Sequence, residues 1–583
     1  KGHAHPVYAH AENLRVEETP FYGSQFPFIR PLGAAVIRLG DAPSGAVPAL
    51  ALGREGHDLW LVEGQWTRDS HRISWELQWG SQGRPLAART SRFTWNGTEE
   101  LAIPAGGSVD LESTVFQVVQ EPEDRIFAPY VAELKRQYPF AGTKSTLARA
   151  AQFCTWNYNI FTNIREQECF ERIGIAGRVM PGGWFQIDHG FQPRRDGGPA
   201  AYVPPDETGH TGTKASVEVD AYFPDPEAAW DLTRFPSGPK GIVGACKTAG
   251  IRPSIWWSPR VDRDGPIVRQ HPEWILEDKD GNRLDVGHLL LDYSVPEVRE
   301  FLENCVRTVT REWGFEGMKL DFFSWMFDHP KARFRRGGAG LEWKRHFVRM
   351  IRSYLGDDGY FLCCISCPLG DPFLAIWGFD SWRAGVDIHS GEWQYHVRSV
   401  AWLLPSILLH GKETWFANID SCLGKPEIPA VERRSRLDFA YVSGGMFEFS
   451  GPSERFTPDM LEEWRRLIER IDQGGEVRCP DQQAFYGRPL PRILVRPHLS
   501  ESATSRNWGI GASIGLFNWG DEAQVVGFTA QQAGISEEAK LLDFWTGQEI
   551  APRLGRSFSI TLPPRGSLLL DANPCELRGS GIG

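Results

Sequence analysis

Between residues 150 and 473, short apolar segments alternate with stretches whose apolar residues recur with the period of an α-helix. Two such stretches, 298–313 and 460–471, place apolar residues three and four positions apart. Eight strand-and-helix units within about 320 residues fit a closed (β/α)8 (TIM) barrel better than an open doubly wound sheet. No Gly-x-Gly-x-x-Gly follows an expected strand, which argues against dinucleotide binding. The expected barrel strands are 153–156, 184–188, 251–257, 317–321, 361–366, 381–387, 414–419 and 445–449.

The two ends of the chain have a different pattern, which predicts all-β units. In the segment 73–79, Ile, Trp, Leu and Trp alternate with polar residues, as in a half-buried strand. At 583 residues the chain is too long for one core. We therefore expect an N-terminal β-sandwich at 1–130, the catalytic barrel at 131–474 and a C-terminal β-sandwich at 475–583. Expected strands in the flanks include 35–39, 59–62, 492–495, 514–518, 539–544, 557–562 and 567–570.

Composition excludes several classes of partner. The net charge of −11 argues against a nucleic-acid partner, which would need a basic surface. No apolar run approaches the roughly 18–20 residues of a membrane span. The ten cysteines lack metal-ligand spacing and are expected to be reduced core thiols. The start, Lys-Gly-His-Ala-His, leaves the compartment open between the cytoplasm, which we favour, and secretion, because a leader could have been trimmed. The oligomeric state also stays open.

Two aspartates lie at the ends of expected barrel strands. Asp321 follows Lys319 by two positions, so both side chains face the same way and the ammonium keeps the carboxylate ionised. Asp387 follows Arg383 by four positions, again on one face if the segment is extended. A strand-end salt bridge or a buried Arg–Asp pair would explain these residues without any chemistry. However, barrel active sites lie at the carboxyl ends of the strands, and glycosidic bond cleavage needs two carboxylates.

Other residues at strand ends are candidates for substrate binding. Asp188 would accept hydrogen bonds from sugar hydroxyls, or else cap or salt-bridge the end of its strand. The chain has 23 tryptophans, and indole faces suit the C–H surfaces of sugars. Trp156, Trp184, Trp256 and Trp257 are candidates for the pocket wall, with core packing as the equal alternative.

Several segments around these residues match one known group of enzymes. The segment 234–238, followed by 249–257, is similar to a third-strand region, and 271–274 and 291–299 are similar to the approach to a fourth strand. The group is the α-galactosidase (melibiase) clan, glycoside hydrolase families 27 and 36. The resemblance covers about residues 150–450 and implies the same central barrel with flanking sandwiches.

The resemblance also implies roles for individual residues. In that clan the aspartate of Lys-x-Asp is the nucleophile, and the aspartate of Trp-Arg-x-x-x-Asp-Ile is the general acid/base. By motif match these are Asp321 and Asp387. Lys319 and Arg383 would then bind sugar hydroxyls.

Two positions depart from the clan pattern. Where the clan has Ile-Asp-Asp followed by Gly or Cys, with paired aspartates holding the 4- and 6-hydroxyls, this chain has Ile-Asp-His-Gly, so His189 replaces the second acid. Where family 27 galactosidases read the 2-hydroxyl with the Glu of Ser-Cys-Glu-Trp-Pro, this chain has Ile-Ser-Cys-Pro with Ser366 and Cys367. In this respect the chain resembles related enzymes that accept a 2-acetamido group, which have a smaller residue at this position. Both changes put the identity of the bound sugar in question.

The combined prediction is a retaining exo-α-glycosidase that acts on α-galactosides by double displacement, with an oligosaccharide or glycoside as its substrate. Asp321 would attack the anomeric carbon and Asp387 would protonate the leaving oxygen. No metal or organic cofactor is expected. The alternatives are an α-N-acetylgalactosaminidase or α-glucosidase with the same pair, a transglycosylase of raffinose-synthase type, and a carbohydrate-binding module that has lost catalysis. The aglycone and the linkage stay open.

Overall fold

The computed structural model describes most of the chain after residue 150. Before that residue it describes six strands, given below, and the helical residues Ala132 and Arg136. The other described residues are 151–156, 164–193, 229–329, 331–338, 340–364, 378–383, 387, 391–403, 407, 415–420, 428–451, 453–471, 475–481, 490–498 and 511–573.

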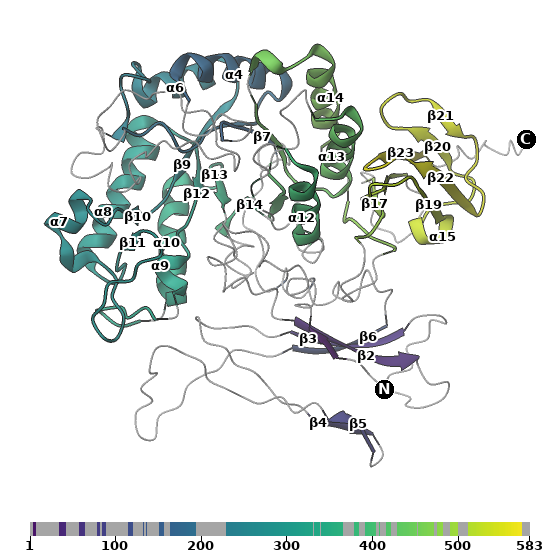
Figure 1. Cartoon of the computed structure of the whole chain (residues 1–583), viewed down its shortest axis with the longest axis horizontal. Coiled ribbons are helices and arrows are strands. Elements are labelled where there is room, and N and C mark those ends of the chain that lie inside the picture. Colours follow the sequence, from purple (N-terminus) through teal and green to yellow (C-terminus); the bar gives the residue numbers. More distant parts are fainter. Residues whose placement is uncertain are drawn as a thin grey trace, which may run out of the picture.

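An eight-stranded sheet forms the centre of the molecule (Figure 1). Every recorded pair of neighbouring strands is parallel, and neighbours in the sheet follow one another in the chain. All eight predicted barrel strands are therefore confirmed, most with bounds one to three residues shorter. The strands are β7 (Ala151–Cys154), β8 (Trp184–Ile187), β9 (Arg252–Trp257), β12 (Gly317–Leu320), β13 (Tyr360–Cys363), β14 (Ser381–Arg383), β15 (Phe416–Asn418) and β16 (Phe447–Phe449).

The sheet closes on itself, as a TIM barrel requires. The first strand, β7, pairs with the last, β16, with Phe447 opposite Ala151. On the other side of β16, the backbone N–H of Met446 donates to the carbonyl of Ala417 in β15 at 2.8 Å. A sheet that returns to its first strand in this order is a closed (β/α)8 barrel.

Helices cover the outside of the barrel between successive strands (Figure 1). Their apolar residues recur on one face, as in α8, where Val298, Leu302, Cys305 and Val306 are buried. In α14 the Thr457 hydroxyl caps the helix by accepting from the Met460 N–H. The helices are α4 (Glu166–Val179), α6 (Gly238–Thr248), α8 (Pro296–Arg307), continued by a π-helical turn at Thr308–Trp313, α9 (Trp325–Asp328), α10 (Gly340–Leu355), α12 (Trp393–Leu403), α13 (Ala430–Val442) and α14 (Pro458–Glu469).

A small insertion stands between β9 and β12. It contains the antiparallel pair β10 (Arg260–Val261) and β11 (Leu289–Leu290), with α7 (Pro266–Gln270) between them. Its apolar residues join two residues from the segment after β12 in a cluster apart from the barrel core. This insertion places Arg260 just beyond the end of β9. The cluster contains Leu276, Leu284, Leu290, Ala332 and Phe334.

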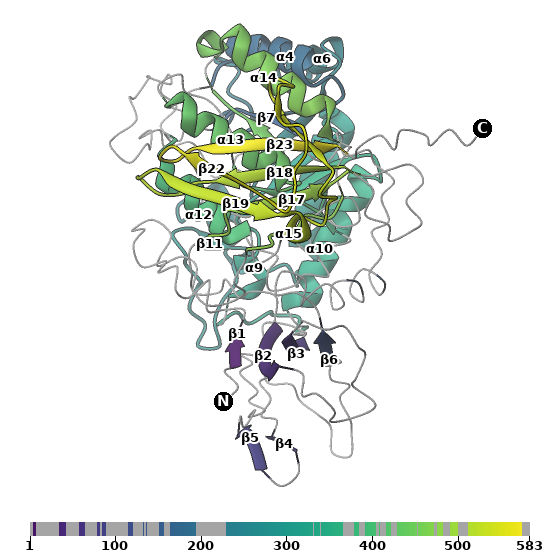
Figure 2. The same ribbon diagram turned by 90° about the vertical axis from the view of Figure 1, so that its right-hand side faces the viewer.

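The C-terminal part of the chain consists of β strands, as predicted, with one short helix, α15 (Ala530–Ala533), and it packs against the barrel helix α13 (Figure 2). Its five-stranded sheet has the order β17-β18-β23-β20-β21, and β19 pairs with β22 separately. All five expected strands of this part are present, and β19 and β21 were missed. The strands are β17 (Ile493–Pro497), β18 (Ala512–Phe517), β19 (Gln524–Thr529), β20 (Lys540–Asp543), β21 (Glu549–Ala551), β22 (Ser557–Leu562) and β23 (Ser567–Asn573).

The N-terminal strands lie below the barrel in Figure 1. Four of them form an antiparallel sheet with the order β1-β2-β3-β6, which confirms the expected strands at 35–39 and 59–62. The segment 73–77 lies outside the described residues. The strands are β1 (Ala4–Pro6), β2 (Ala34–Asp41), β3 (Asp58–Gly64) and β6 (Val115–Gln120), with β4 (Gln78–Ser81) paired to β5 (Arg84–Ala88).

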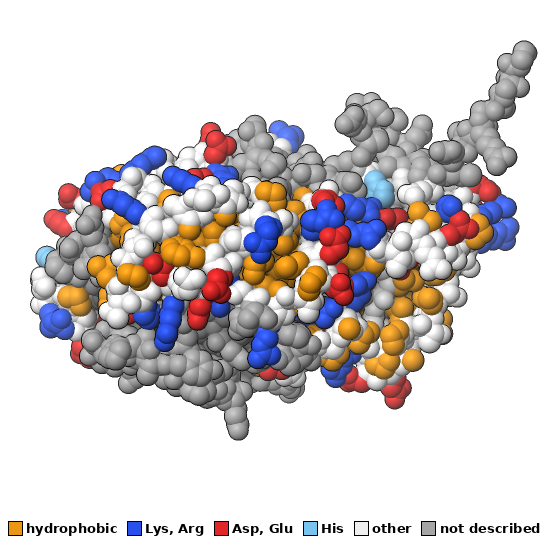
Figure 3. Space-filling model, turned by 90° about the horizontal axis from the view of Figure 1, so that it is seen from above, with side chains coloured by type: hydrophobic (Ala, Val, Ile, Leu, Met, Phe, Trp, Pro, Cys, Tyr) orange, Lys and Arg blue, Asp and Glu red, His pale blue; other side chains and the backbone are white. Residues whose placement is uncertain are grey.

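The surface seen from above in Figure 3 carries acidic and basic side chains side by side over the helices. Such a mixed surface is typical of a face that contacts water. No helix in the described part of the chain has the length and apolar character needed to cross a membrane.

Candidate active site

Asp321 follows the last residue of β12, at the carboxyl end of the barrel. Its backbone N–H donates to the carbonyl of Trp257 on the neighbouring strand at 2.9 Å. The indole Nε1–H of Trp256 donates to Oδ2 at 3.0 Å, and the backbone N–H of Phe322 donates to Oδ1 at 2.8 Å. Both oxygens of this buried carboxyl group are therefore held in place.

Opposing effects set the ionisation of Asp321. Burial raises the pKa of its carboxyl group, and the nearby Asp387 carboxylate adds to the rise. The charges of Lys319 and Arg260 and the hydrogen bond from Trp256 act in the other direction. Because the net pKa remains above the ordinary aspartate value, ionisation of Asp321 depends on the cations beside it.

Lys319 is paired with Asp188 across the inside of the barrel. Its Nζ lies 2.7 Å from Oδ2 of Asp188, and both side chains are almost fully buried. The Cys154 thiol and the His189 backbone N–H also donate to the Asp188 carboxylate, at 3.3 and 2.9 Å. Burial alone would lower the pKa of Lys319, but Asp188 and further acids raise it well above its ordinary value. Lys319 thus bonds to Asp188, whereas its effect on Asp321 is electrostatic.

Arg383 and Asp387 form a buried ion pair at the end of β14. The Nη2 of Arg383 donates to Oδ1 of Asp387 at 2.7 Å, and its Nη1 lies 3.4 Å from Oδ1 of Asp420. Burial would lower the pKa of Arg383, but Asp420 and Asp387 raise it well above its ordinary value. The alternative explanation for these two residues, a buried Arg–Asp pair, is therefore present in the structure. Two acids already engage the guanidinium that the family resemblance assigns to sugar hydroxyls.

The charges of both predicted catalytic carboxylates act on one buried thiol, that of Cys364. Cys364 follows β13, the strand between β12 and β14 in the sheet. Burial raises the pKa of the Cys364 thiol well above its ordinary value, and both Asp321 and Asp387 add to the rise. Asp321 and Asp387 are 4% and 7% exposed, so neither is sealed off completely. The barrel therefore brings the two carboxylates to one end and into electrostatic contact with each other.

Three aromatic rings stack beside Asp321. The imidazole of His189 lies 4.8 Å from the Trp256 ring and 6.0 Å from the Trp156 ring, with interplanar angles of 20° and 21°. Trp256 is the side chain that donates to Asp321. Three predicted substrate-binding residues thus line up next to the predicted nucleophile.

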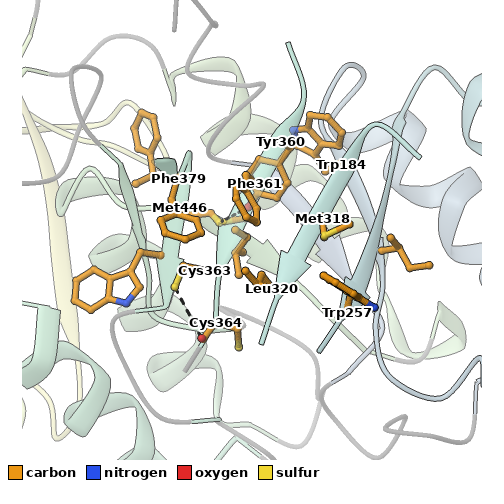
Figure 4. Close-up of a cluster of buried hydrophobic side chains, with 14 of the residues drawn as sticks. Trp184, Trp257, Met318, Leu320, Tyr360, Phe361, Cys363, Cys364, Phe379 and Met446 are labelled. Carbon is orange, nitrogen blue, oxygen red and sulfur yellow. Dashed lines mark hydrogen bonds between the residues drawn. The ribbon is translucent and has the colours of Figure 1, made fainter. Parts of the chain in front are cut away.

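Two of the predicted pocket-wall tryptophans lie elsewhere, and that prediction is corrected for them. Trp184 is fully buried at the start of β8, where it stacks on Tyr360 at 4.9 Å (Figure 4). Trp257 is fully buried and packs against Phe347 of helix α10 at 6.1 Å. Residues next to each other on a strand point to opposite faces, so Trp256 facing into the barrel turns Trp257 outward.

Two predicted substrate-binding residues lie in a part of the chain that the structure does not describe. Ser366 and Cys367 lie outside the described residues, as do residues 384–386 next to Asp387. In the described parts of the chain, no group of three His, Cys, Asp or Glu side chains is arranged to hold a metal ion.

Glu448 was missed by the sequence analysis. It is fully buried in the middle of β16 and accepts hydrogen bonds from Asn418, at 2.7 Å, and from Gln152. Burial, with the Asp420 charge, raises the pKa of Glu448 to about 7, against the opposing effects of Lys319 and Arg383. The available signal was a single acid between two phenylalanines in a strand predicted to be buried.

Arg260 was also missed, because it follows β9 in a segment with no strand or helix period. Its guanidinium lies 4.0 Å from the centroid of the Phe322 ring and 5.9 Å from that of Trp256. Its charge lowers the pKa of Asp321. It therefore belongs to the surroundings of the predicted nucleophile.

The geometry can be compared with known proteins. Over 325 residues the chain is 21% identical to a probable α-galactosidase G of Aspergillus terreus, a match that covers 45% of this chain. The chain resembles the α-galactosidases. The match covers 40% of that relative's length, and the resemblance predicted from the motifs is confirmed by it. No model of a protein family matches the chain.

Solved structures support the same fold. A family 27 β-L-arabinopyranosidase of Geobacillus stearothermophilus superimposes with a TM-score of 0.55 at 14% identity, covering 74% of this chain and 98% of that one. A structure of that enzyme in complex with arabinose superimposes with a TM-score of 0.54 and the same identity and coverage. At this identity the likeness concerns the fold alone, and it agrees with the eight-stranded barrel.

Proposed function

We propose that the protein is a retaining exo-α-glycosidase that releases terminal α-galactosyl units by double displacement. The observation that carries the proposal is that Asp321 and Asp387 follow β12 and β14 at the same end of the barrel, where the charges of both act on the thiol of Cys364. Two carboxyl groups that both reach one bound sugar are what the two steps of this reaction need, about 5–5.5 Å apart for retention. The similarity to a probable α-galactosidase supports the same reaction class.

In the first step, one oxygen of ionised Asp321 attacks the anomeric carbon as the glycosidic bond breaks. The leaving oxygen takes the proton of Asp387, and the sugar becomes an ester of Asp321. In the second step, Asp387 removes a proton from a water molecule that attacks the same carbon. The bond to Asp321 breaks, the free sugar leaves with its original anomeric configuration, and Asp387 holds a proton again.

The surroundings of each carboxyl group suit its role. Lys319 and Arg260 favour the anionic form of Asp321, which also stabilises the positive charge that develops on the sugar ring. Arg383 donates to Oδ1 of Asp387 and so orients the carboxyl group that would carry the transferred proton.

The sugar would bind between Asp188 and the aromatic stack. Asp188, which is paired with Lys319, would accept hydrogen bonds from sugar hydroxyls, and His189 occupies the position where the α-galactosidase clan has a second acid. Because this position departs from the α-galactosidase pattern, N-acetylgalactosamine and glucose stay candidates. A β-L-arabinopyranoside, which has the galactose configuration without C6, joins them on the strength of the fold relative.

A panel of nitrophenyl glycosides tests the reaction and the sugar together. We expect the fastest hydrolysis with the α-galactoside, measured against the α-N-acetylgalactosaminide, α-glucoside and β-L-arabinopyranoside. Asp321→Asn should remove all turnover while a bound galactose remains detectable by calorimetry. Absence of turnover on every member by the unchanged protein would leave only the binding-module alternative. Sugar transfer that exceeds hydrolysis at high acceptor concentration would instead identify a transglycosylase.

We further propose that the flanking β sheets are β-sandwiches, with boundaries near residues 130 and 474. The support is the antiparallel order of the strands in each flank and the separate apolar cluster of the C-terminal part. Limited proteolysis followed by mass spectrometry tests these boundaries, since cleavage should concentrate near them.

A further inference from the structure

One cation lies against both residues that hold the predicted nucleophile. Arg260 begins the short strand β10, and its Nε donates to the Ser258 hydroxyl at 3.0 Å. Its guanidinium then covers the ring of Phe322 at 4.0 Å and approaches the ring of Trp256 at 5.9 Å. Cations within about 6 Å of an aromatic centroid are attracted by the ring.

Those two rings belong to the two hydrogen-bond donors of Asp321. The Phe322 backbone N–H donates to Oδ1, and the Trp256 indole donates to Oδ2. A single guanidinium therefore packs on the side chains of both residues that donate to the carboxylate, one through its backbone N–H and the other through its indole. Arg260 belongs to β10, in the insertion after β9, whereas Asp321 follows β12.

Phe322 needs such support because of its backbone. It has a φ of +51°, in the left-handed region that non-glycine residues rarely adopt. This conformation is the one in which its N–H donates to the Asp321 side chain. Arg260 on the ring and Trp325 at 5.5 Å hold the Phe322 side chain in that geometry.

We propose that Arg260 is a positioning residue for the nucleophile: it holds Phe322 and Trp256 in their hydrogen-bonding geometry and keeps a positive charge beside Asp321. This inference rests on the proposed glycosidase function and adds a residue to it. Four charged or titratable groups face Asp321 from separate elements. They are Lys319 of β12, Arg260 of β10, Asp387 after β14 and Cys364 after β13.

The test measures kcat and kcat/KM of Arg260→Met and Arg260→Lys against pH. Asp321 must be ionised to attack, so loss of the Arg260 charge should move the acid limb of kcat/KM to higher pH. For Arg260→Met we expect kcat to fall about tenfold to a hundredfold, as for other losses of positioning. Arg260→Lys keeps the charge but not the planar stack, so its acid limb should stay near that of the unchanged protein while kcat falls.

Arg263→Met is the matched control, because it removes an equal charge three positions away. Arg263 is exposed and pairs with Asp285 at 2.5 Å, so its loss should leave the acid limb where it is. Thermal unfolding of all variants separates folding from positioning. The inference would be overturned if the acid limb of the kcat/KM profile fell at the same pH in Arg260→Met as in Arg263→Met, whatever the thermal stability of Arg260→Met. If Arg260→Met does not fold, an unchanged kcat in Arg260→Lys overturns the inference.

The two proposals fail separately. If Asp321→Asn retains full turnover, the proposed reaction is wrong and Arg260 has no nucleophile to position. If Asp321→Asn is inactive and the Arg260 variants behave like the control, only the role of Arg260 is wrong.

Discussion

Asp321 occupies a site where burial alone would favour its protonated form. The carboxylate is kept available by Lys319, Arg260 and the Trp256 indole, which together oppose burial and the like charge of Asp387. An anion in such a site is poorly solvated by water and interacts strongly with positive charge that develops on a bound sugar. The same residues therefore explain both why the group can ionise and what it would do once ionised.

Asp387 is proposed to be the proton donor, and leaving groups of different acidity test this. In Asp387→Asn we expect kcat/KM on poor leaving groups such as alkyl galactosides to fall about 100-fold to 10,000-fold. On dinitrophenyl galactoside, which leaves without a proton, kcat/KM should change little. The measurement is a plot of log kcat/KM against leaving-group pKa, which should be steeper for the variant. An equal loss on every substrate would remove the proton-donor role from Asp387.

The buried pair Lys319–Asp188 should matter to stability as well as to activity. Lys319→Met leaves Asp188 as a buried charge without its cation, so we expect a loss of about 3–5 kcal/mol in the free energy of unfolding. The acid limb of kcat/KM should also move to higher pH, because Lys319 lowers the pKa of Asp321. Lys540→Met is the control: Lys540 pairs with Glu549 on the surface, where we expect a change of about 0–1 kcal/mol.

Denaturant unfolding measures both changes in the free energy of unfolding. If Lys319→Met and Lys540→Met change it equally, the buried pair contributes no more to stability than the surface pair. The double variant Lys319→Met with Asp188→Asn should recover part of the loss, because it removes the uncompensated charge.

At the scale of elements, helix α13 joins the barrel to the C-terminal sheet through a buried acid. Asp438 of α13 accepts from Trp545 Nε1 at 2.7 Å and from the Ser567 hydroxyl at 2.6 Å. Burial raises the pKa of Asp438 to about 7, against these two hydrogen bonds. The proton is therefore bound more tightly in the folded protein than in the unfolded chain, whose aspartates titrate near pH 4.

This raised pKa predicts how stability depends on pH. The folded state holds the extra proton between about pH 4 and pH 7, so the contribution of Asp438 is largest below pH 4 and is lost as the pH rises to about 7. Asp438→Asn removes this loss while keeping an acceptor for Trp545. We expect the melting temperature of the variant, relative to the unchanged protein, to rise between pH 5 and pH 7.5.

The exposed Asp357 provides the comparison, and Asp357→Asn should show no such pH-dependent difference. A melting temperature difference for Asp438→Asn that stays constant with pH would contradict the titration assigned to this group.

The barrel strands could be predicted because each is a short apolar run, and eight such runs in one region leave few alternatives. The direction of individual side chains was harder to foresee. Trp256 and Trp257 are adjacent and identical, so strand alternation places them on opposite faces, but it does not tell which of the two faces Asp321 and which packs on Phe347. Arg260 was missed for a related reason, since its place depends on how an irregular insertion folds back.

At the scale of the whole molecule, the chain order of the barrel explains why distant motifs meet. Asp188, Asp321 and Asp387 follow β8, β12 and β14, and a closed parallel sheet brings the ends of all its strands to one rim. The sequence alone could therefore predict that these acids lie at one rim of the barrel. It could not predict that Lys319 pairs with Asp188 instead of Asp321, because that choice depends on distances across the barrel.

For the N-terminal and C-terminal parts of the chain, the sequence predicted strands but few of the contacts between them. The alternating pattern predicted their strands, but not the polar contacts that fix the C-terminal sheet on the barrel. Arg470 at the end of α14 binds Asp571 of β23 through two hydrogen bonds of 2.7 and 3.0 Å. Such pairs join residues about a hundred positions apart, so no local pattern reveals them.

The most direct test of the account is a mass spectrum of the protein after reaction with 5-fluoro-α-galactosyl fluoride, whose ester with the enzyme is slow to hydrolyse. We predict a mass increase of one fluorosugar, located after peptic digestion on the peptide that contains Asp321 and absent in Asp321→Asn. A sugar attached to any other residue would contradict the assignment of the nucleophile. Rapid turnover with no adduct, and a product of inverted configuration, would contradict the double displacement itself.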